Sequence, residues 1–482
     1  MKRNRMSRRT VIAGSAALGA ASMTSSRAVA QAGGATTGQA SQPAGGLPAR
    51  GEFVVRGAHV LTMDAGIGDL PSGDVHVRNG AIVAVAAGIA APGADAIDGR
   101  GTICMPGFVE THWHLWTSVF RPIMRQDDPA RSYFPVTSRL GQHMTPEDSH
   151  RSVRMGLAEA LSAGVTTVHN WAHNVRSPAH ADAELSAMRD MGIRGRFAYG
   201  TPQGMANDTA MDLADLARVK REWMPNDGML TLGICSRNVG NDPNPMRGTV
   251  TIDMAKKEWG GARALGLPIT LHTSGPPVAK LLDGAGLLGP DVQLVHPLNT
   301  SAEDRAILAR RGVSYSTSPT GESRRPGDIQ LAELLEAGVK TSISIDHNTT
   351  YNCDCFVCMR MLYSMNLHRM GKKFQLTTKR LVQLATIDGA TDLGIADKTG
   401  SLTPGKRADL ILVRTTDINM APVGDPYDAL VALAQPTNVD TVVADGRILR
   451  RGNKFTALDH GKVVRDGAES AAALRARAKW PA

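Results

Sequence analysis

The stretch Met105-Pro106-Gly107-Phe108-Val109-Glu110-Thr111-His112-Trp113-His114 decides the fold of this chain. Its first part is apolar, as in a buried strand, and it ends in two histidines separated by one residue. Side chains two positions apart on a strand point to the same side, so His112 and His114 can hold one metal ion together. A pair of this kind is a weak signal alone, because polar residues are common where strands end.

Three further residues of metal-ligand type stand where apolar segments end. His272, His296 and Asp346 each follow a run of apolar or small residues directly. Histidine and aspartate are ligands of divalent metals in proteins. Their repeated placement at strand ends indicates one common site rather than chance.

Strands and helices alternate from Met105 onward. We expect strands that end near Thr111, Asn170, Tyr199, Cys235, His272, His296, Ser316 and Asp346, and helices over residues 146–163, 181–191, 252–265, 302–311 and 330–337. Alternation of this kind predicts an α/β fold, a (β/α)8 TIM-like barrel. Active sites of such barrels lie at the carboxyl ends of the strands, which is where the metal-ligand residues fall.

Both flanks of the barrel have β character. Residues 52–104 contain short strands and turns such as Asn79-Gly80, and residues 400–470 return to strands followed by Asp-Gly turns. We expect these two segments to pair in a small β-sandwich built from both ends of the chain. The barrel would then occupy residues 105–399.

Residues 1–30 resemble an export signal. Basic residues precede a small apolar stretch, Arg8-Arg9 lies within a Ser-Arg-Arg-Thr run, and Ala28-Val29-Ala30 resembles a cleavage site. We therefore expect a twin-arginine signal peptide, a linker over residues 31–51, and a mature protein in the periplasm or outside the cell without a stable membrane anchor. A basic cytosolic N-terminus is the alternative.

Composition and charge narrow the class of protein. The 482 residues are 42% hydrophobic and 21% charged, as expected for a globular protein. The formal net charge is +9, but residues 1–30 hold six Lys and Arg and no acid, which leaves +3 for the rest. That balance gives no reason to expect binding to nucleic acid.

The five cysteines do not form a disulfide framework in a chain of this length. Cys353, Cys355 and Cys358 lie close together, but no second cysteine cluster completes a tetrahedral metal site. We interpret them as small side chains on a loop and at the start of a helix, with a metal or redox role as the alternative.

Residues 106–114 are similar to the strand-one signature of the amidohydrolase superfamily. Residues 164–168, 400–410 and Asp445-Gly446-Arg447 resemble other motifs of its cytosine-deaminase-like and triazine-chlorohydrolase-like branch, and the resemblance spans roughly residues 52–465. It implies a metal-dependent hydrolase of a non-peptide C–N bond, in an amide or an amino-substituted N-heterocycle. The partner would be a small-molecule substrate.

The resemblance also implies roles for the strand-end residues. The metal ligands would be His112, His114, His272 and Asp346. His296 would face the metal-activated water without binding the metal tightly. Strand four ends in Cys235 instead of the lysine that binuclear members carry, which implies one divalent ion, Zn²⁺ or Fe²⁺.

Catalysis would then depend on two of these residues. Asp346 would take a proton from the water that the metal activates, and His296 would stabilise charge on an oxyanion or ring nitrogen. We also expect His173, Asn170 and Trp116 to line the substrate pocket; packing in the core is the alternative for Trp116. His347 would lie behind the ligands, because it points away from Asp346 on a strand.

The chain departs from the deaminating members in one place. These usually carry a glutamate three residues after the strand-five histidine, where this chain has His272-Thr273-Ser274-Gly275. The sequence therefore does not choose between deamination and amide hydrolysis. One alternative function is a hydrolase of the same fold that acts on an ester or phosphoester. The other, a non-catalytic metal-binding scaffold, predicts eroded ligands, whereas all are present. The sequence leaves open whether the chain forms a homo-oligomer.

Overall fold

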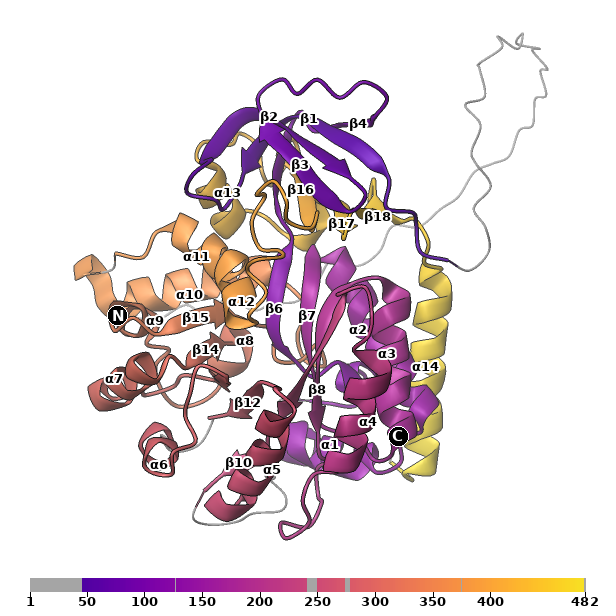
Figure 1. The fold of residues 1–482 in the computed structure, drawn as a ribbon, viewed down its shortest axis with the longest axis vertical. Helices are drawn as coiled ribbons and strands as arrows, with labels where there is room; N and C mark the ends of the chain where they lie inside the picture. Colours follow the sequence, from indigo (N-terminus) through magenta and orange to yellow (C-terminus); the bar gives the residue numbers. More distant parts are fainter. Residues whose placement is uncertain (1–45, 126, 241–248, 274–277, 374, 481–482) are drawn as a thin grey trace, which may run out of the picture. The chain divides into compact units, whose positions relative to one another are not determined.

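The computed structural model describes residues 46–125, 127–240, 249–273, 278–373 and 375–480 (Figure 1). The predicted signal peptide and residues 31–45 of the predicted linker lie outside these ranges. Within them, no helix has the length and the apolar character that a membrane crossing requires.

An eight-stranded parallel sheet forms the barrel, and its strands are neighbours in the order in which they occur along the chain. They are β6 (Phe108–Trp113), β7 (Val165–Ala172), β8 (Arg194–Gly200), β9 (Leu230–Cys235), β12 (Ile269–His272), β13 (Val292–Val295), β14 (Ser314–Thr317) and β15 (Lys340–Ile343). Every predicted strand end lies within three residues of the observed one. The structure confirms the predicted fold class.

The barrel closes beside the predicted metal site. A parallel bridge joins Trp113 of β6 to Asp346, which follows β15. The N–H of His114 donates to the carbonyl of Asp346, and the N–H of Asp346 donates to the carbonyl of His112, both at 2.8 Å. The first and last strands therefore meet at residues that the sequence singles out as ligands.

Helices surround the barrel in Figure 1. They are α1 (Tyr133–Gly141), α2 (Pro146–Ser162), α3 (Pro178–Met191), α4 (Leu213–Trp223), α5 (Ile252–Ala264), α6 (Ala279–Gly284), α7 (Ala302–Arg311), α8 (Pro319–Glu322), α9 (Leu331–Glu336), α10 (Cys355–Met370), α11 (Thr378–Leu384) and α12 (Ile387–Asp392). Local signals set their ends: Thr145 and Asp148 form a capping box before α2, and Gly192, with φ of 66°, ends α3. Short 3-10 helices such as η1 (Leu115–Phe120), and the small pair β10 (Asn238–Val239) and β11 (Thr249–Val250), lie in the connections.

Both ends of the chain build a second, nine-stranded sheet, in the order β19-β18-β17-β16-β5-β1-β2-β3 with β4 beside β1. The strands are β1 (Glu52–Leu61), β2 (Asp69–Arg78), β3 (Ala81–Ala86), β4 (Asp95–Asp98), β5 (Thr102–Pro106), β16 (Leu410–Arg414), β17 (Val439–Ala444), β18 (Arg447–Arg451) and β19 (Lys454–Phe455). Antiparallel pairing of β16 with β5 joins the two ends, as the sequence predicts. Asn79 and Gly80, with φ of 51° and 83°, make the tight turn between β2 and β3.

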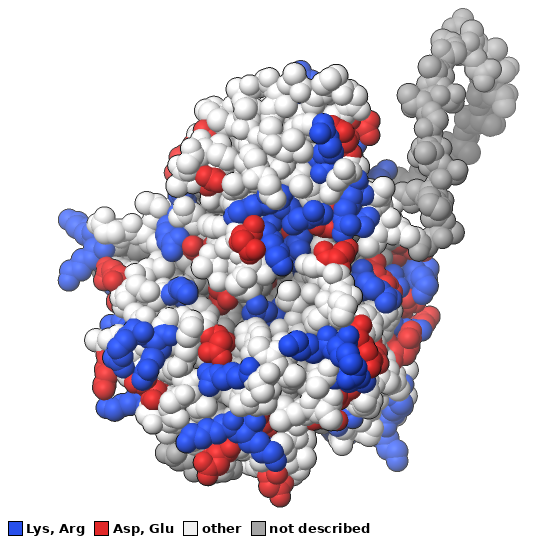
Figure 2. Space-filling view, viewed as in Figure 1, with Lys and Arg blue, Asp and Glu red and all other residues white. Residues whose placement is uncertain are grey.

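The C-terminal part also contains helices. α13 (Pro426–Ala432) lies between β16 and β17, and α14 (His460–Arg477) follows β19 and runs beside α2 (Figure 1). Asp459 caps α14 by accepting a hydrogen bond from the N–H of Lys462. Residues 460–470, which the sequence assigns to the β-sandwich, therefore lie in a helix on the outside of the barrel. Charges of both signs are interspersed over the face drawn in Figure 2.

Candidate metal centre and substrate pocket

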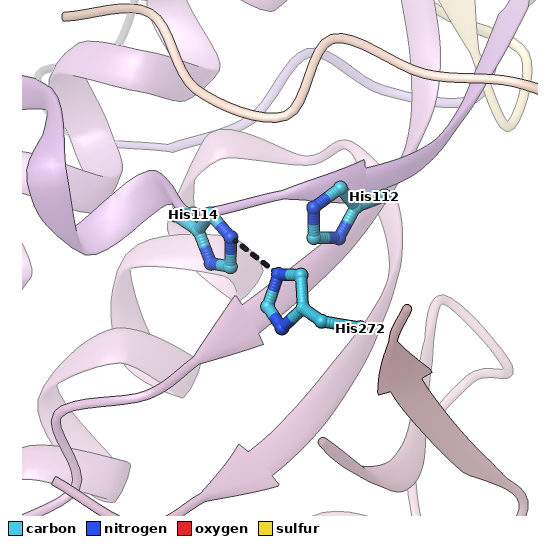
Figure 3. Close-up of side chains that lie close together, drawn as sticks. All are labelled: His112, His114 and His272. Carbon is cyan, nitrogen blue, oxygen red and sulfur yellow. Dashed lines mark hydrogen bonds between the residues drawn. The ribbon is translucent and has the colours of Figure 1, made fainter. Parts of the chain in front are cut away.

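The structure brings the predicted metal ligands together at the carboxyl ends of the barrel strands. His112 and His114 come from the end of β6 and His272 from the end of β12, and their imidazoles turn toward one another (Figure 3). The Nε2 atoms of His114 and His272 are 3.2 Å apart. Oδ1 of Asp346 lies 3.2 Å from Nε2 of His112 and 3.4 Å from Nε2 of His114.

These spacings fit one divalent ion. Ligand atoms at about 2.0–2.1 Å from a tetrahedral ion are about 3.3 Å from one another. Burial lowers the pKa of His112 and of His272 well below the usual value, so both imidazoles are neutral, as ligation requires. Burial is the largest influence on the pKa of Asp346 and raises it, but hydrogen bonds from His112 and His114, together with the nearby His296 and His347, outweigh burial and hold that pKa well below its usual value.

His296 and Asp346 both have a left-handed backbone, with φ of 68° and 73°. Such a conformation costs a residue other than glycine of order 1–3 kcal/mol and is found preferentially at active sites. Hydrogen bonds to neighbouring strands hold it: the N–H of His296 donates to the carbonyl of Ser316, and that of Asp346 to the carbonyl of His112. The two side chains lie beside each other, with Nε2 of His296 3.9 Å from Oδ2 of Asp346.

Glu322 is a site residue that the sequence reasoning missed. Its Oε1 lies 3.0 Å from Nδ1 of His296, and its carboxylate accepts hydrogen bonds from the hydroxyl of Thr317 and the N–H of Ser318. We assign a proton to Nδ1 because its partner is a carboxylate. Nε2 of His296 then faces the cavity, and no hydrogen-bond partner for it exists among the residues that the structure describes.

Glu110 is a second site residue that the sequence reasoning missed. Its Oε1 accepts hydrogen bonds from the N–H of His112 at 3.0 Å and from the N–H of Ile345 at 2.9 Å, which ties the first strand to the turn after the last. Burial raises the pKa of Glu110 to about 8, against the two backbone hydrogen bonds that lower it. Glu110 therefore positions the backbone on both sides of the metal site without reaching into the cavity.

A cavity of about 300 Å³ lies over the ligand cluster, a size suited to a small molecule. His173 lines it: its ring stacks on that of His272 at 5.2 Å, and its Nε2 has no partner within the described part of the chain. His347 lines it as well, although the sequence places this residue behind the ligands. The strained turn at Asp346 ends the alternation of a regular strand, so the side chain of the next residue is free to reach the cavity.

Asn170 does not line the cavity, so its predicted role is wrong. Its Nδ2 donates to Oε2 of Glu184 on α3 at 2.8 Å. Alternate side chains of β7 point to opposite faces, and it is Trp171 that lies against the ligands, with its ring centroid 4.0 Å from that of His112. The sequence prediction chose Asn170, which lies on the opposite face of β7 from Trp171, and so missed Trp171.

Trp116 does not line the cavity either, which corrects the second pocket prediction. The side chain is fully buried in η1, and its ring packs edge-on against Phe120 at 5.5 Å. The short helix after β6 turns this ring into a separate apolar cluster, which is the core alternative that the sequence left open. Tyr133 lines the cavity in the same region, with its ring 5.7 Å from that of His114.

Cys353, Cys355 and Cys358 are buried free thiols at the start of α10. None of them joins a group of metal-ligating side chains in the described ranges. This agrees with their interpretation as small packed side chains.

The comparisons with known proteins agree with this geometry. The model of the amidohydrolase family matches residues 103–449. The 5'-deoxyadenosine deaminase of Methanosarcina mazei is 26% identical, over 88% of this chain and 99% of its own length. The 5-methylthioadenosine/S-adenosylhomocysteine deaminase of Pelotomaculum thermopropionicum is 27% identical, over 88% of this chain and 98% of its own length.

Solved structures share the fold. An adenosine deaminase from Xanthomonas campestris with bound zinc has a TM-score of 0.77 and 20% identity, and the match covers 90% of this chain and 100% of that one. An atrazine chlorohydrolase from Arthrobacter aurescens complexed with zinc has a TM-score of 0.75 and 20% identity, over 87% and 100% of the two chains. The chain belongs to the amidohydrolase family and is a metal-dependent hydrolase of non-peptide C–N bonds.

Proposed function

We propose that the protein removes the amino group of an amino-substituted N-heterocycle with one zinc ion held by His112, His114, His272 and Asp346. The observation that carries this proposal is Nε2 of His296, which faces the cavity unpartnered beside Asp346 while Glu322 holds the opposite ring nitrogen. The deaminase relatives and the zinc in the solved structures support the substrate class and the metal.

The bound ion would lower the pKa of a water molecule from about 15.7 toward 7. Asp346, which is ionised, would accept a proton as water adds to the ring carbon. Nε2 of His296, 3.9 Å away, is placed to receive this proton and to deliver it to the leaving nitrogen. The products are ammonia and a ring carbonyl.

Glu322 would stabilise His296 while the imidazole carries the extra proton. The carboxylate of a Ser-His-Asp triad acts on its histidine in the same way, by fixing the tautomer and favouring the imidazolium. The pair Glu322–His296 would thus do the proton transfer for which deaminating relatives use a glutamate after the strand-five histidine. The carboxylate of Glu322 would thus take the place of the glutamate that this chain lacks after His272.

The test is to measure ammonia release by the zinc-loaded protein from adenosine derivatives and aminotriazines, with amides and esters assayed beside them. We expect ammonia, and replacement of the amino group by oxygen in the product mass spectrum. Turnover of the amides or esters alone would overturn the heterocycle proposal. Elemental analysis should find one ion per chain, and two tightly held ions would refute the single-metal site.

We also propose that residues 1–30 export the protein through the twin-arginine route. The support is the sequence itself, in which Arg8-Arg9 precedes a small apolar stretch. This route carries folded proteins, which suits an enzyme that takes up its metal in the cytoplasm.

A further inference from the structure

The cavity carries more positive charge than the proposed reaction needs. Its lining includes five arginines: Arg125, Arg131, Arg237, Arg324 and Arg325. Asp346 is the one carboxylate among the described residues that line it, and Asp346 belongs to the metal site. An arginine in a cavity wall points to an anionic ligand when no carboxylate of the protein neutralises its charge.

Three of the five arginines are bound to nearby groups of the protein. Arg125 donates two hydrogen bonds to Asp127, at 3.0 and 2.7 Å. Arg237 forms a buried ion pair with Glu258, and Arg131 donates from Nε to the carbonyl of Ile123 at 2.9 Å. These guanidinium groups already have partners in the protein, so their presence does not require a ligand.

Arg324 and Arg325 differ from the other three. Neither has a carboxylate at ion-pair distance within the ranges that the structure describes. Nη1 of Arg325 is buried without a hydrogen-bond partner, and so is the hydroxyl of Tyr133, which also lines the cavity. Leaving a buried polar group unpaired costs about 1–3 kcal/mol, and more for a charged group. A ligand that supplies acceptor oxygens would remove this cost.

The turn that carries these arginines also packs on the catalytic residues. Gly321 lies so close to Asp346 that a Cβ on it would stand 2.8 Å from Oδ2. Glu322 contacts His296, and the N–H of Arg325 donates to the carbonyl of Glu322 at 2.9 Å. The backbone that carries both arginines is therefore held at a fixed place relative to the reacting end.

A row of ring contacts runs from the metal site to Arg324. The ring of Tyr133 lies 5.7 Å from that of His114 and 5.5 Å from that of His347. The ring of Tyr351 lies 5.6 Å from that of His347 and carries the guanidinium of Arg324 at 4.4 Å. Because Asp346, Arg324 and Arg325 line the same cavity of about 300 Å³, one small molecule can contact the metal site and both arginines at once.

We propose that the substrate carries an oxyanion, a carboxylate or a phosphate, which Arg324 and Arg325 bind while its reacting carbon faces Asp346 and His296. This inference rests on the proposed function and adds the chemical class of the substrate. The planar fork of a guanidinium matches both carboxylate and phosphate oxygens. The hydroxyl of Tyr133 would donate a further hydrogen bond.

Binding of simple probes tests the anion site without turnover. Isothermal titration calorimetry on the zinc-loaded full-length protein would compare benzoate, phenyl phosphate and the neutral benzamide. We expect the anions to bind more tightly, and the double variant Arg324→Met, Arg325→Met to lose about tenfold or more of that affinity, with benzamide unchanged. The stronger of benzoate and phenyl phosphate identifies the oxyanion.

The matched control is Arg310→Met, Arg311→Met. These adjacent arginines lie on α7 and pair with Asp283, and neither lines the cavity, so their removal changes the net charge equally. We expect this control to keep the affinity for both anions. Equal anion affinity in the wild-type protein and the Arg324/Arg325 double variant would overturn the proposal.

Turnover separates this proposal from the proposed function. For two amino-heterocycles that differ only in a carboxylate, the double variant should lower kcat/KM for the acid about 10- to 100-fold more than it lowers kcat/KM for the neutral substrate. Arginine-dependent anion binding without any C–N hydrolysis would refute the function and keep the anion site. Turnover that ignores both the carboxylate and the arginines would refute the anion site and keep the function. Arg325→Glu, which should favour a cationic substituent instead, provides a second variant should the double variant misfold.

Discussion

Oε1 of Glu322 lies 3.0 Å from Nδ1 of His296, and both side chains are buried. The contact joins the end of β13 to α8 beyond β14, so residues 26 positions apart form one unit. The hydroxyl of Thr317 and the N–H of Ser318 hold the carboxylate in place. The site therefore contains a carboxylate–imidazole pair, although no glutamate follows His272 at the expected place.

Glu322→Gln should lower kcat about 10- to 100-fold with little change in KM, a range taken from the loss of carboxylate partners of metal-ligating histidines. The amide cannot stabilise a protonated His296 as the carboxylate does. Steady-state kinetics and metal content should be measured on the same preparation. An unchanged kcat with metal bound would show that the pair has no part in proton transfer.

Gly321→Ala should disturb Asp346 through contact alone. The added Cβ would lie 2.8 Å from Oδ2 of Asp346, and a displacement of about 1 Å at a catalytic group can cost about 100-fold in rate. Gly284→Ala is the matched control, because a Cβ on Gly284 in α6 meets nothing within 4 Å. Equal activity of the two variants would contradict the close packing of α8 on Asp346.

Asp346→Asn should abolish turnover more completely than it weakens folding. Asparagine fills the same space but cannot take a proton from water, and loss of a general base typically costs about 10²–10⁴-fold. Turnover, bound metal and thermal melting would be compared in one preparation. Near-normal rates with metal bound would assign the role of base to another group, such as His296.

Glu184→Gln should stabilise the protein more at alkaline than at acid pH. Burial raises the pKa of Glu184 to about 8 from 4.5, against a hydrogen bond from Asn170 that lowers it. As the pH rises from about 4.5 to 8, the unfolded chain releases this proton while the folded chain keeps it, so the wild-type protein loses stability over that range. Glutamine has no proton to release, so the variant does not lose stability in this way.

Thermal melting at about pH 5 and about pH 8 measures this effect. The melting temperature of the Glu184→Gln variant minus that of the wild type should be larger at about pH 8 than at about pH 5. Glu336→Gln is the control, because it makes the same chemical change at an exposed glutamate at the end of α9. A pH-independent difference for Glu184→Gln would mean that Glu184 is ionised in the folded protein.

Replacing Arg8 and Arg9 by lysine should keep the protein in the cytoplasm. Lysine preserves the positive charge, so the change tests the paired arginines rather than the basic character of residues 1–30. Fractionation of cells that express either form gives the result. Undiminished export of the lysine variant would exclude the twin-arginine route.

The sequence by itself determined the elements and the ends that matter for the site. Apolar segments placed each strand end within three residues, and His112, His114, His272 and Asp346 meet because parallel strands of a barrel end on the same side. The capping box before α2 shows the same local control, since the signals lie within four residues of one another. These features depend on neighbours along the chain.

Only the tertiary structure decided which side chains face the cavity. A shift of one residue on β7 exchanges Asn170 for Trp171, and the turn of η1 sends Trp116 into the core, so neither could be placed from its nearness to a ligand. The pairing of Glu322 with His296, and the place of Arg324 and Arg325 in the cavity wall, depend on segments that converge from different strands. Such contacts depend on packing between distant segments, which no local pattern encodes.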